Sequence, residues 1–352
     1  MLAPSMALQS SRAGRFAVES MLTLLALAFL LLVAEGLFRL LVPADALPRA
    51  PASRGLDVHP ELPRLVLEDL GRPGVRGVHA DVVHENNRDG FRGPERPRTR
   101  PAGIPRIAII GDSTAMGWGV PQPDTFAARL EDSLREKNTP GPPEVLNFGL
   151  AAMTAHGAVK RLVELGLDFD PDVVVYAFAV NDIQGPHYRS SLDRDYAASL
   201  FRHDSKSHLW RWLRPRWLAF RELVLTPEGT FAFELDDNYF HNPEAWGALK
   251  ATLEGFAALA REHDFCPVIV LNTQMQSLNA LHPYTRHYEA VAAMARELGL
   301  ATIEPLERFQ MEDAENLWVH RGDRHANRRA HAIYAELIGD AIQGLPPHCL
   351  AP

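Results

Sequence analysis

The chain has 352 residues, of which 46% are hydrophobic and 23% charged, fractions that fit a folded globular protein rather than a disordered one. The formal net charge is -8 and no run of lysine and arginine stands out, which excludes the basic surface of a nucleic-acid-binding protein. The only cysteines, Cys266 and Cys349, exclude a disulfide-rich scaffold, and the sequence leaves open whether they pair. No cluster of Asp and His has metal-ligand spacing, so we expect neither a metal ion nor another cofactor.

An apolar segment near the N-terminus predicts a membrane-spanning helix. Residues 21–34 carry no charge, and with its flanks the segment 16–42 exceeds the roughly 20 residues that cross a bilayer. Arg12 and Arg15 precede it, which predicts a cytoplasmic tail over 1–15, a signal anchor over 16–42 and an extracytoplasmic remainder. A cleaved signal peptide lacks a convincing cleavage site here, and an amphipathic surface helix conflicts with apolar residues on all faces.

The next segment, residues 43–104, is rich in proline, arginine and glycine and predicts a linker followed by an irregular or β-rich lead-in. Within it, NNRDGFRG (86–93) has the composition of a tight turn. We expect a surface turn there, and a segment covering the functional site is the alternative.

From residue 105 onward, strands and helices alternate. The predicted strands are short apolar runs at 106–111, 144–149, 172–180, 266–272 and 301–305. Apolar residues at helical spacing predict helices at 124–134, 154–165, 243–263, 285–298 and 326–342. Fully apolar strands alternating with helices predict a five-stranded parallel sheet with helices on both faces, a three-layer α/β/α domain of flavodoxin-like type over 105–345.

One segment, residues 183–240, interrupts the alternation and is too long for an ordinary loop. It is rich in Trp, Arg, Tyr and Phe, as in HLWRWLRPRWLAF (208–220), and we predict an inserted, partly helical cap. Its aromatic and basic side chains suit an anionic or acyl-bearing substrate, a membrane surface, or ordinary packing onto the main domain.

Polar residues follow the predicted strand ends, where ligands bind in open α/β sheets. Ser113 follows the first strand, Asn181 follows the third, and Asp323 and His325 precede the last helix. A serine hydroxyl needs a neighbouring base, usually histidine, which a carboxylate orients, and the oxyanion formed by its attack needs N–H donors. These residue types predict ester chemistry, whereas Asn147 at the second strand end is expected to be a structural hydrogen-bonder.

Four segments resemble, in order, the conserved blocks of the SGNH/GDSL hydrolase family. A Gly-Asp-Ser alone is weak, but four blocks in the right order, each at a strand end or helix start, are specific. The resemblance is closest to bacterial members with an N-terminal membrane helix, in which Gly-Trp-Gly-Val commonly follows Gly-Asp-Ser, and it covers residues 86–342. The segments are IAIIGDSTAMGWGVPQPDTFAARLEDSL (107–134), VLNFGLAAMTAHG (145–157), VVVYAFAVNDI (173–183) and GDRHANRRAHAIYAELI (322–338).

The resemblance implies a role for each matching residue. Ser113 would be the nucleophile, His325 the general base and then acid, and Asp323 the residue that orients His325. The oxyanion hole would combine the backbone N–H groups of Ser113 and Ala152 with the side-chain amide of Asn181.

Two positions depart from the family pattern. Ala152 replaces a glycine of the second block; it keeps the N–H, but alanine is strained if the site needs a positive φ. The acid and base are spaced D-x-H rather than D-x-x-H, so a dyad of Ser113 and His325 with a backbone carbonyl as orienter is the alternative to Asp323.

The implied function is that of a serine esterase, cleaving an acyl (for example O-acetyl) ester of a small molecule, glycan or lipid, expected in the cell envelope, through an acyl-serine intermediate. An O-acyltransferase using the same triad and a non-catalytic binding protein with this fold are the alternatives. Structural interpretations also exist: Ser113 as a helix N-cap, Asn181 in a strand-ending turn, and Asp323 with His325 as a surface turn and cap.

Overall fold

The computed structural model describes residues 5–42, 61–136, 143–184, 207–220, 231–279, 281–320 and 323–350. The chain divides into two compact units, one of residues 1–52 with 189–230 and a larger one of residues 53–188 with 231–352. Parts of the predicted tail, lead-in and insertion lie outside the described residues, namely 1–4, 43–60, 185–206 and 221–230. The predicted domain boundaries therefore stay predictions.

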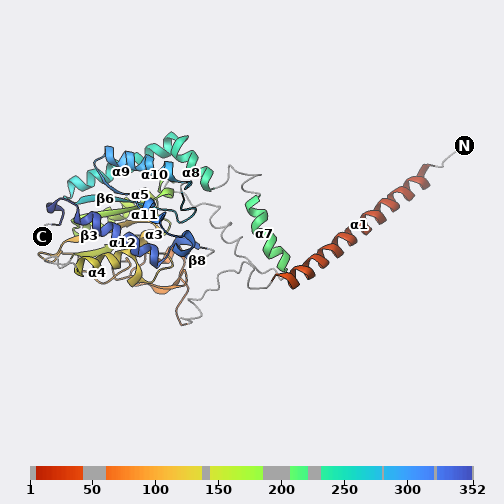
Figure 1. Cartoon of the computed structure of the whole chain (residues 1–352), viewed down its shortest axis with the longest axis horizontal. Helices are drawn as coiled ribbons and strands as arrows, with labels where there is room; N and C mark the ends of the chain where they lie inside the picture. Colours follow the sequence, from red (N-terminus) through yellow and green to blue (C-terminus); the bar gives the residue numbers. More distant parts are fainter. Residues whose placement is uncertain are drawn as a thin grey trace. The chain divides into compact units, whose positions relative to one another are not determined.

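A five-stranded parallel sheet forms the centre of the larger unit (Figure 1). Its order is β4-β3-β5-β6-β7. The first of these strands in the sequence, β3, therefore lies inside the sheet, with β4 on one side of it and β5, β6 and β7 on the other. Every residue of β3 and β5 is buried, as continuous apolar runs predict for strands covered on both faces. The strands are β3 (Arg106–Gly111), β4 (Glu144–Asn147), β5 (Val173–Ala179), β6 (Cys266–Asn272) and β7 (Ala301–Ile303).

Helices cover both faces of this sheet because successive strand residues point to opposite sides. Ile107 and Val175 enter the core beneath α4 and α12, whereas Ala108 and Tyr176 enter the core beneath α5, α8, α9 and α10. Figure 1 shows α9 and α10 on the side of the sheet opposite to α4. The helices are α4 (Phe126–Glu136), α5 (Ala155–Glu164), α8 (Phe231–Phe240), α9 (Pro243–Glu262), α10 (Thr285–Glu297) and α12 (Arg328–Gln343). The predicted three-layer α/β/α class is confirmed.

Short elements connect these layers. Two-stranded antiparallel sheets join β1 (Arg76–His79) to β2 (Val82–Glu85) and β8 (Trp318–His320) to β9 (Asp323–Ala326). The short α-helices are α3 (Ser113–Met116) and α11 (Leu306–Phe309). Single turns of 3₁₀ helix are η1 (Leu67–Asp69), η2 (Gln122–Asp124), η3 (Gly166–Phe169), η4 (Val180–Ile183), η7 (Ala314–Leu317) and η8 (Pro347–Leu350).

The lead-in segment 86–93 forms the expected turn, in which the Gly90 N–H donates to the Asn87 carbonyl at 3.1 Å, but most of its residues are buried instead of lying at the surface. Arg92 is 3% exposed, and its guanidinium donates hydrogen bonds to the carbonyls of Met116 (3.2 Å), Gly117 (2.8 Å) and Val120 (2.7 Å). These carbonyls belong to the last residue of α3 and to the loop that follows it, and a guanidinium carries enough donors to satisfy all three at once. The segment therefore holds that loop in place.

The two cysteines form a disulfide, the pairing that the sequence left open. Cys266 is the first residue of β6 and Cys349 lies in η8, at a sequence separation of 83. The bond ties the C-terminal end of the described chain to the sheet.

The smaller unit contains two described helices, α1 (Ser5–Leu41) and α7 (His208–Phe220). Within the described residues, the stretch Val18–Leu41 of α1 is the one helix long and apolar enough to cross a membrane, a test that a signal sequence also passes. None of that stretch is buried inside the protein.

Candidate active site

The turn after β3 places Ser113 at the carboxyl edge of the sheet. Gly111 has φ +146°, and a Cβ there would lie 2.5 Å from the carbonyl oxygen of Ala177, so the position accepts only glycine. Asp112 caps α3, its Oδ1 accepting a hydrogen bond from the N–H of Thr114 at 2.9 Å. Ser113 is thus the first residue of α3 and is half-buried.

The structure brings Ser113, His325 and Asp323 together. Ser113 Oγ lies 3.0 Å from His325 Nε2, although 212 residues separate them in sequence. His325 Nδ1 lies 2.5 Å from Asp323 Oδ1, and the His325 N–H donates to the same oxygen at 3.1 Å. With Nδ1–H donating to the carboxylate, Nε2 is left to accept the proton of the serine hydroxyl. This is the geometry of an activated nucleophile.

Asp323 is held as an anion by its neighbours. Burial alone would raise the pKa of its carboxyl group, but the hydrogen bond and charge of His325 and the indole of Trp118 outweigh it and bring the pKa to about 2. A charged Asp323 fixes the tautomer of His325 and stabilises an imidazolium there.

Trp118 holds the acid–base pair from the other side. Its Nε1–H donates to Asp323 Oδ2 at 2.8 Å, and its ring stacks on His325 with centroids 4.9 Å apart and planes 18° apart. Gly117, with φ +86°, lets the chain turn directly before Trp118, whose own N–H donates to the Ser113 carbonyl at 2.9 Å. Both carboxylate oxygens of Asp323 are therefore occupied.

The position of His325 differs from the expected helix start. The last helix, α12, begins at Arg328, where Asn327 Oδ1 accepts from the N–H groups of Arg329 (2.9 Å) and Ala330 (3.2 Å). His325 and Asp323 instead lie on β9. Residues two apart in a strand point to the same side, which explains physically how the D-x-H spacing brings acid and base into contact.

The groups predicted as oxyanion donors lie after three neighbouring strands. Ser113 follows β3, Ala152 follows β4 and Asn181 follows β5. The loop after β4 lies against the turn before Ser113, because the Leu150 N–H donates to the Gly111 carbonyl at 3.0 Å. Within the described residues, no acceptor takes the N–H of Ser113, the N–H of Ala152 or the side-chain amide of Asn181. In the part of the chain that the structure describes, all three donors are thus left without an internal acceptor.

Ala152 has φ +63°, in the left-handed region that glycine adopts without strain. The site therefore does need a positive φ at the position where the family has glycine, and Ala152 adopts that conformation. Its side chain is exposed, so the strain is in the backbone and not in packing.

Buried polar groups support these strand ends. Asn147 donates to the Ala115 carbonyl at 2.8 Å and accepts from the Gly149 N–H at 3.0 Å, the structural role expected of it. Asp182 Oδ2 accepts from the Tyr176 hydroxyl at 2.7 Å. Burial and then the charge of Asp112 raise the pKa of Asp182 well above its usual range. These residues brace the turns on either side of Ser113.

Sequence reasoning missed the roles of Trp118 and Arg92. Trp118 stood in a quoted motif, but nothing in the sequence indicates that its indole reaches an acid 205 residues away. Arg92 lay in a segment with the composition of a surface turn. An arginine beside an apolar Phe91, itself 2% exposed, is the one signal of burial that the segment contains.

The comparison with protein-family models gives one match. The model of the GDSL-like Lipase/Acylhydrolase family matches residues 109–333. The chain belongs to the GDSL-like Lipase/Acylhydrolase family. This member of the family is accordingly a carboxylic ester hydrolase, and the resemblance stated from its sequence is confirmed.

Solved structures give further similarities, whereas a comparison with curated protein sequences gives no match. The chain is similar to an acetyl xylan esterase, AlAXEase (14% identity, TM-score 0.42, covering 67% of this chain and 99% of that one). It is also similar to a lipase/acylhydrolase from Enterococcus faecalis (15%, 0.42, covering 68% and 96%) and to TesA (17%, 0.43, covering 68% and 99%). Identities this low do not transfer a substrate to this chain.

Proposed function

We propose that this hydrolase cleaves acyl esters through an acyl-enzyme formed on Ser113. His325 Nε2 removes the hydroxyl proton while Oγ bonds to the acyl carbonyl carbon. When the C–O bond to the alcohol breaks, His325 returns the proton to the leaving oxygen. A water molecule then repeats the attack, giving its proton to His325, and the acid leaves as Ser113 regains its hydroxyl hydrogen. The 3.0 Å approach of Oγ to Nε2 is the observation that carries this proposal.

The negative charge of each tetrahedral intermediate is stabilised by the N–H groups of Ser113 and Ala152 and the amide of Asn181. Each such donor contributes about 2.7–4 kcal/mol to transition-state stabilisation. Among the described residues these donors have no internal acceptor, which supports this role, since a donor already bonded within the protein would have to break that bond first.

Covalent trapping tests the proposal. The full-length protein is treated with a fluorophosphonate probe, and hydrolysis of p-nitrophenyl acetate is measured in parallel. Ser113→Ala should abolish both labelling and hydrolysis with an unchanged thermal melt, whereas the matched control Ser133→Ala, on α4, should retain both. Labelling of the folded Ser113→Ala variant would refute the assignment. Adding an oligosaccharide acceptor to an acetyl donor separates hydrolysis from acyl transfer, since only transfer leaves acetyl on the sugar.

We further infer a location outside the cytoplasm, with α1 as the single membrane anchor. Arg12 and Arg15 precede the apolar stretch, which favours a cytoplasmic N-terminus. The Cys266–Cys349 disulfide supports the same orientation, because such bonds persist in oxidising compartments. Acyl esters of envelope glycans or lipids are then the substrates within reach. Alkylation of the protein in intact cells, with and without prior reduction, tests the orientation. Cys266 and Cys349 should be alkylated only after reduction, and their alkylation without reduction would refute it.

A further inference from the structure

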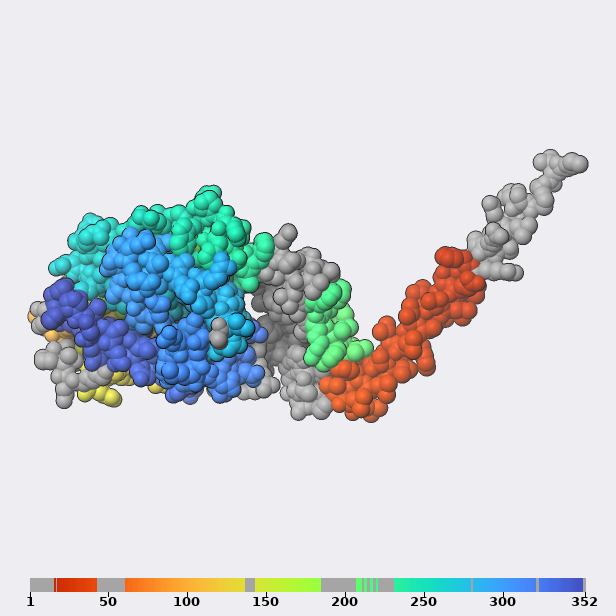
Figure 2. Space-filling model, turned by 45° about the horizontal axis from the view of Figure 1, so that its top comes forward, coloured from red at the N-terminus to blue at the C-terminus, as the bar shows by residue number. Residues whose placement is uncertain are grey.

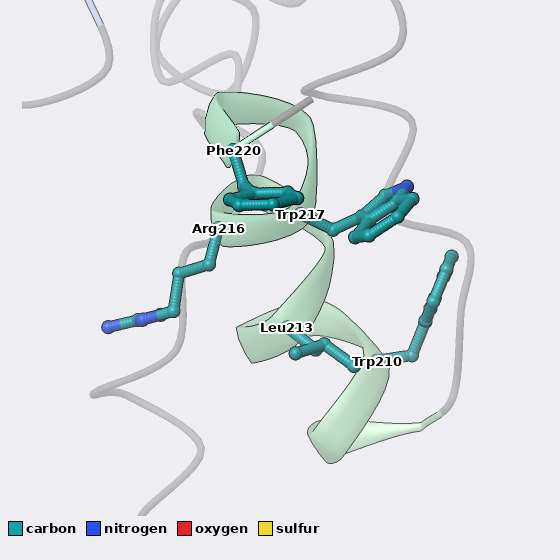
Figure 3. A pocket seen from close by; sticks show the side chains of 5 residues that line it. All are labelled: Trp210, Leu213, Arg216, Trp217 and Phe220. Carbon is teal, nitrogen blue, oxygen red and sulfur yellow. The ribbon is translucent and has the colours of Figure 1, made fainter. Parts of the chain in front are cut away.

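Helix α7 exposes an apolar face. Trp210, Leu213, Trp217 and Phe220 are 46%, 41%, 49% and 47% exposed. Their spacing of three, four and three residues puts them on one side of the helix. Figure 3 shows Trp210 and Trp217 projecting from the same side of α7, and Arg216 lines the same hollow as the four apolar side chains. Large apolar side chains gathered in this way mark a contact surface.

The start of α7 is fixed to one end of α1. The Glu35 carboxylate of α1 accepts hydrogen bonds from Ser207 Oγ (2.7 Å) and from the N–H groups of His208 (2.8 Å) and Leu209 (2.9 Å). The first N–H groups of a helix have no partner within the helix, so this carboxylate acts as the N-terminal cap of α7. A residue of the apolar anchor thus determines where α7 begins.

A different side of α7 faces α1. The ring of Trp212 lies 5.4 Å from that of Phe38, and the Arg216 guanidinium lies 3.9 Å above the same Trp212 ring. Figure 2 shows α7, in green, beside the end of α1. Trp212 therefore packs towards the anchor, and the face containing Trp210 and Trp217 remains open to another contact.

The depth of this junction follows from the length of the uncharged stretch. Residues 20–34 of α1 contain no charged side chain and, at 1.5 Å per residue, extend about 22 Å. Centred in a hydrocarbon core about 30 Å thick, a stretch of this length ends about 4 Å short of the boundary on either side, so Glu35, the first charged residue after it, lies just inside that boundary. Helix α7 consequently begins at the level where lipid tails meet headgroups.

The charge of α7 suits that level. The helix contains three arginines and no acidic residue, in a chain whose net charge is -8. Helices that lie in the membrane interface are rich in tryptophan and in basic residues such as arginine. Their aromatic rings enter the acyl–headgroup boundary, and their guanidinium groups bind anionic headgroups.

We propose that α7 is a second membrane contact, lying along an anionic bilayer surface with Trp210, Leu213, Trp217 and Phe220 in the acyl–headgroup boundary. This inference rests on the proposed anchor, because α7 owes its depth to α1. It does not depend on which side of the membrane the larger unit occupies, since α7 and that unit both follow the same end of α1 in the chain.

Site-directed spin labelling of the full-length protein tests the proposal. Both cysteines of the sequence are paired, so a new cysteine is the only free thiol. Labels are placed at Leu213→Cys and Phe220→Cys on the apolar face, at Leu27→Cys within the anchor, and at Leu281→Cys, an 87% exposed position of the larger unit. The protein is reconstituted into vesicles of phosphatidylcholine with phosphatidylglycerol. Collision rates are measured with oxygen, which concentrates in lipid, and with a water-soluble nickel complex.

The labels at 213 and 220 should shift towards oxygen and away from nickel relative to the label at 281, and the label at 27 should shift further. If 27 is in lipid while 213 and 220 match 281, the anchor stands and the α7 proposal is wrong. If 27 also matches 281, both fail. Labels at 213 and 220 shielded from both reagents would indicate a protein partner and overturn the proposal. Each variant should keep its p-nitrophenyl acetate hydrolysis, since none of these positions contacts Ser113.

Discussion

The left-handed backbone of Ala152 makes a prediction with an unusual sign: removing a side chain should stabilise the protein. An L-residue in this region costs about 1–2 kcal/mol, which glycine does not incur. Glycine in turn gives the unfolded chain more conformational entropy, a loss of about 0.4–1 kcal/mol. The exposed methyl group contributes little packing. Ala152→Gly should therefore raise the free energy of unfolding by about 0.8 kcal/mol.

The neighbouring alanine supplies a matched control. Ala151 is absent from the residues with positive φ and packs partly against the cluster of Leu65, Leu70 and Met116, so Ala151→Gly should lower the free energy of unfolding by about 0.7 kcal/mol or more, through chain entropy and lost packing. In urea titrations, the free energy of unfolding should lie above that of the parent for Ala152→Gly and below it for Ala151→Gly. The two variants should then differ from each other by about 1.5 kcal/mol or more. Hydrolysis by Ala152→Gly should stay close to that of the parent, because the donated N–H is retained. Equal destabilisation by both changes would refute the left-handed assignment.

Three further changes have defined outcomes. Trp118→Phe keeps an aromatic ring beside His325 but removes the hydrogen bond to Asp323, which contributes about 1.5–3 kcal/mol. The value of kcat/KM should therefore fall about 10–100-fold. An unchanged kcat/KM would contradict a role of Trp118 in positioning Asp323. Burial lowers the pKa of His331 from 6.5 to about 3. The unfolded chain therefore takes up this proton first, and stability is lost as pH falls from about 6.5 towards 3, by about 2.5 kcal/mol between pH 7 and 4.5. His331→Asn should remove that part of the pH dependence in urea titrations, and an unaltered slope would exclude it. Replacing Cys266 and Cys349 together by alanine opens a loop of 83 residues and should cost up to about 4.5 kcal/mol in thermal unfolding, with hydrolysis at 25 °C retained.

The fold could be predicted from sequence because its signals are local. Each strand of the sheet is a continuous apolar run, and a strand buried on both faces permits little else. The predicted run 106–111 coincides with β3, and 266–272 with β6. The predicted last helix, 326–342, began two residues early because Asn327 is the cap and the preceding residues pair with β8. Helix ends depend on such caps and are less visible than the apolar periodicity within.

Within the candidate site, Ser113 and His325 could be proposed from sequence because each lies in a segment that resembles a block of the family, Ser113 directly after a predicted strand and His325 shortly before the last helix. The contacts of Trp118 and Arg92 were not, since each links segments whose proximity exists only in the folded chain. The conformation of Ala152 stood between these cases. The replacement of the family glycine by alanine suggested that a positive φ could be needed there, and only the folded backbone shows that Ala152 adopts one.

The crosslink between Cys266 and Cys349 lies where β6 begins, whereas Ser113 and Asn181 follow the ends of β3 and β5. In a parallel sheet all strands begin at one edge and finish at the other. The disulfide and the residues of the proposed active site are thus at opposite edges of the sheet. Loops at the edge where the strands end can change in length or composition to accommodate another ester. The disulfide at the edge where the strands begin would still stabilise the sheet that supports those loops.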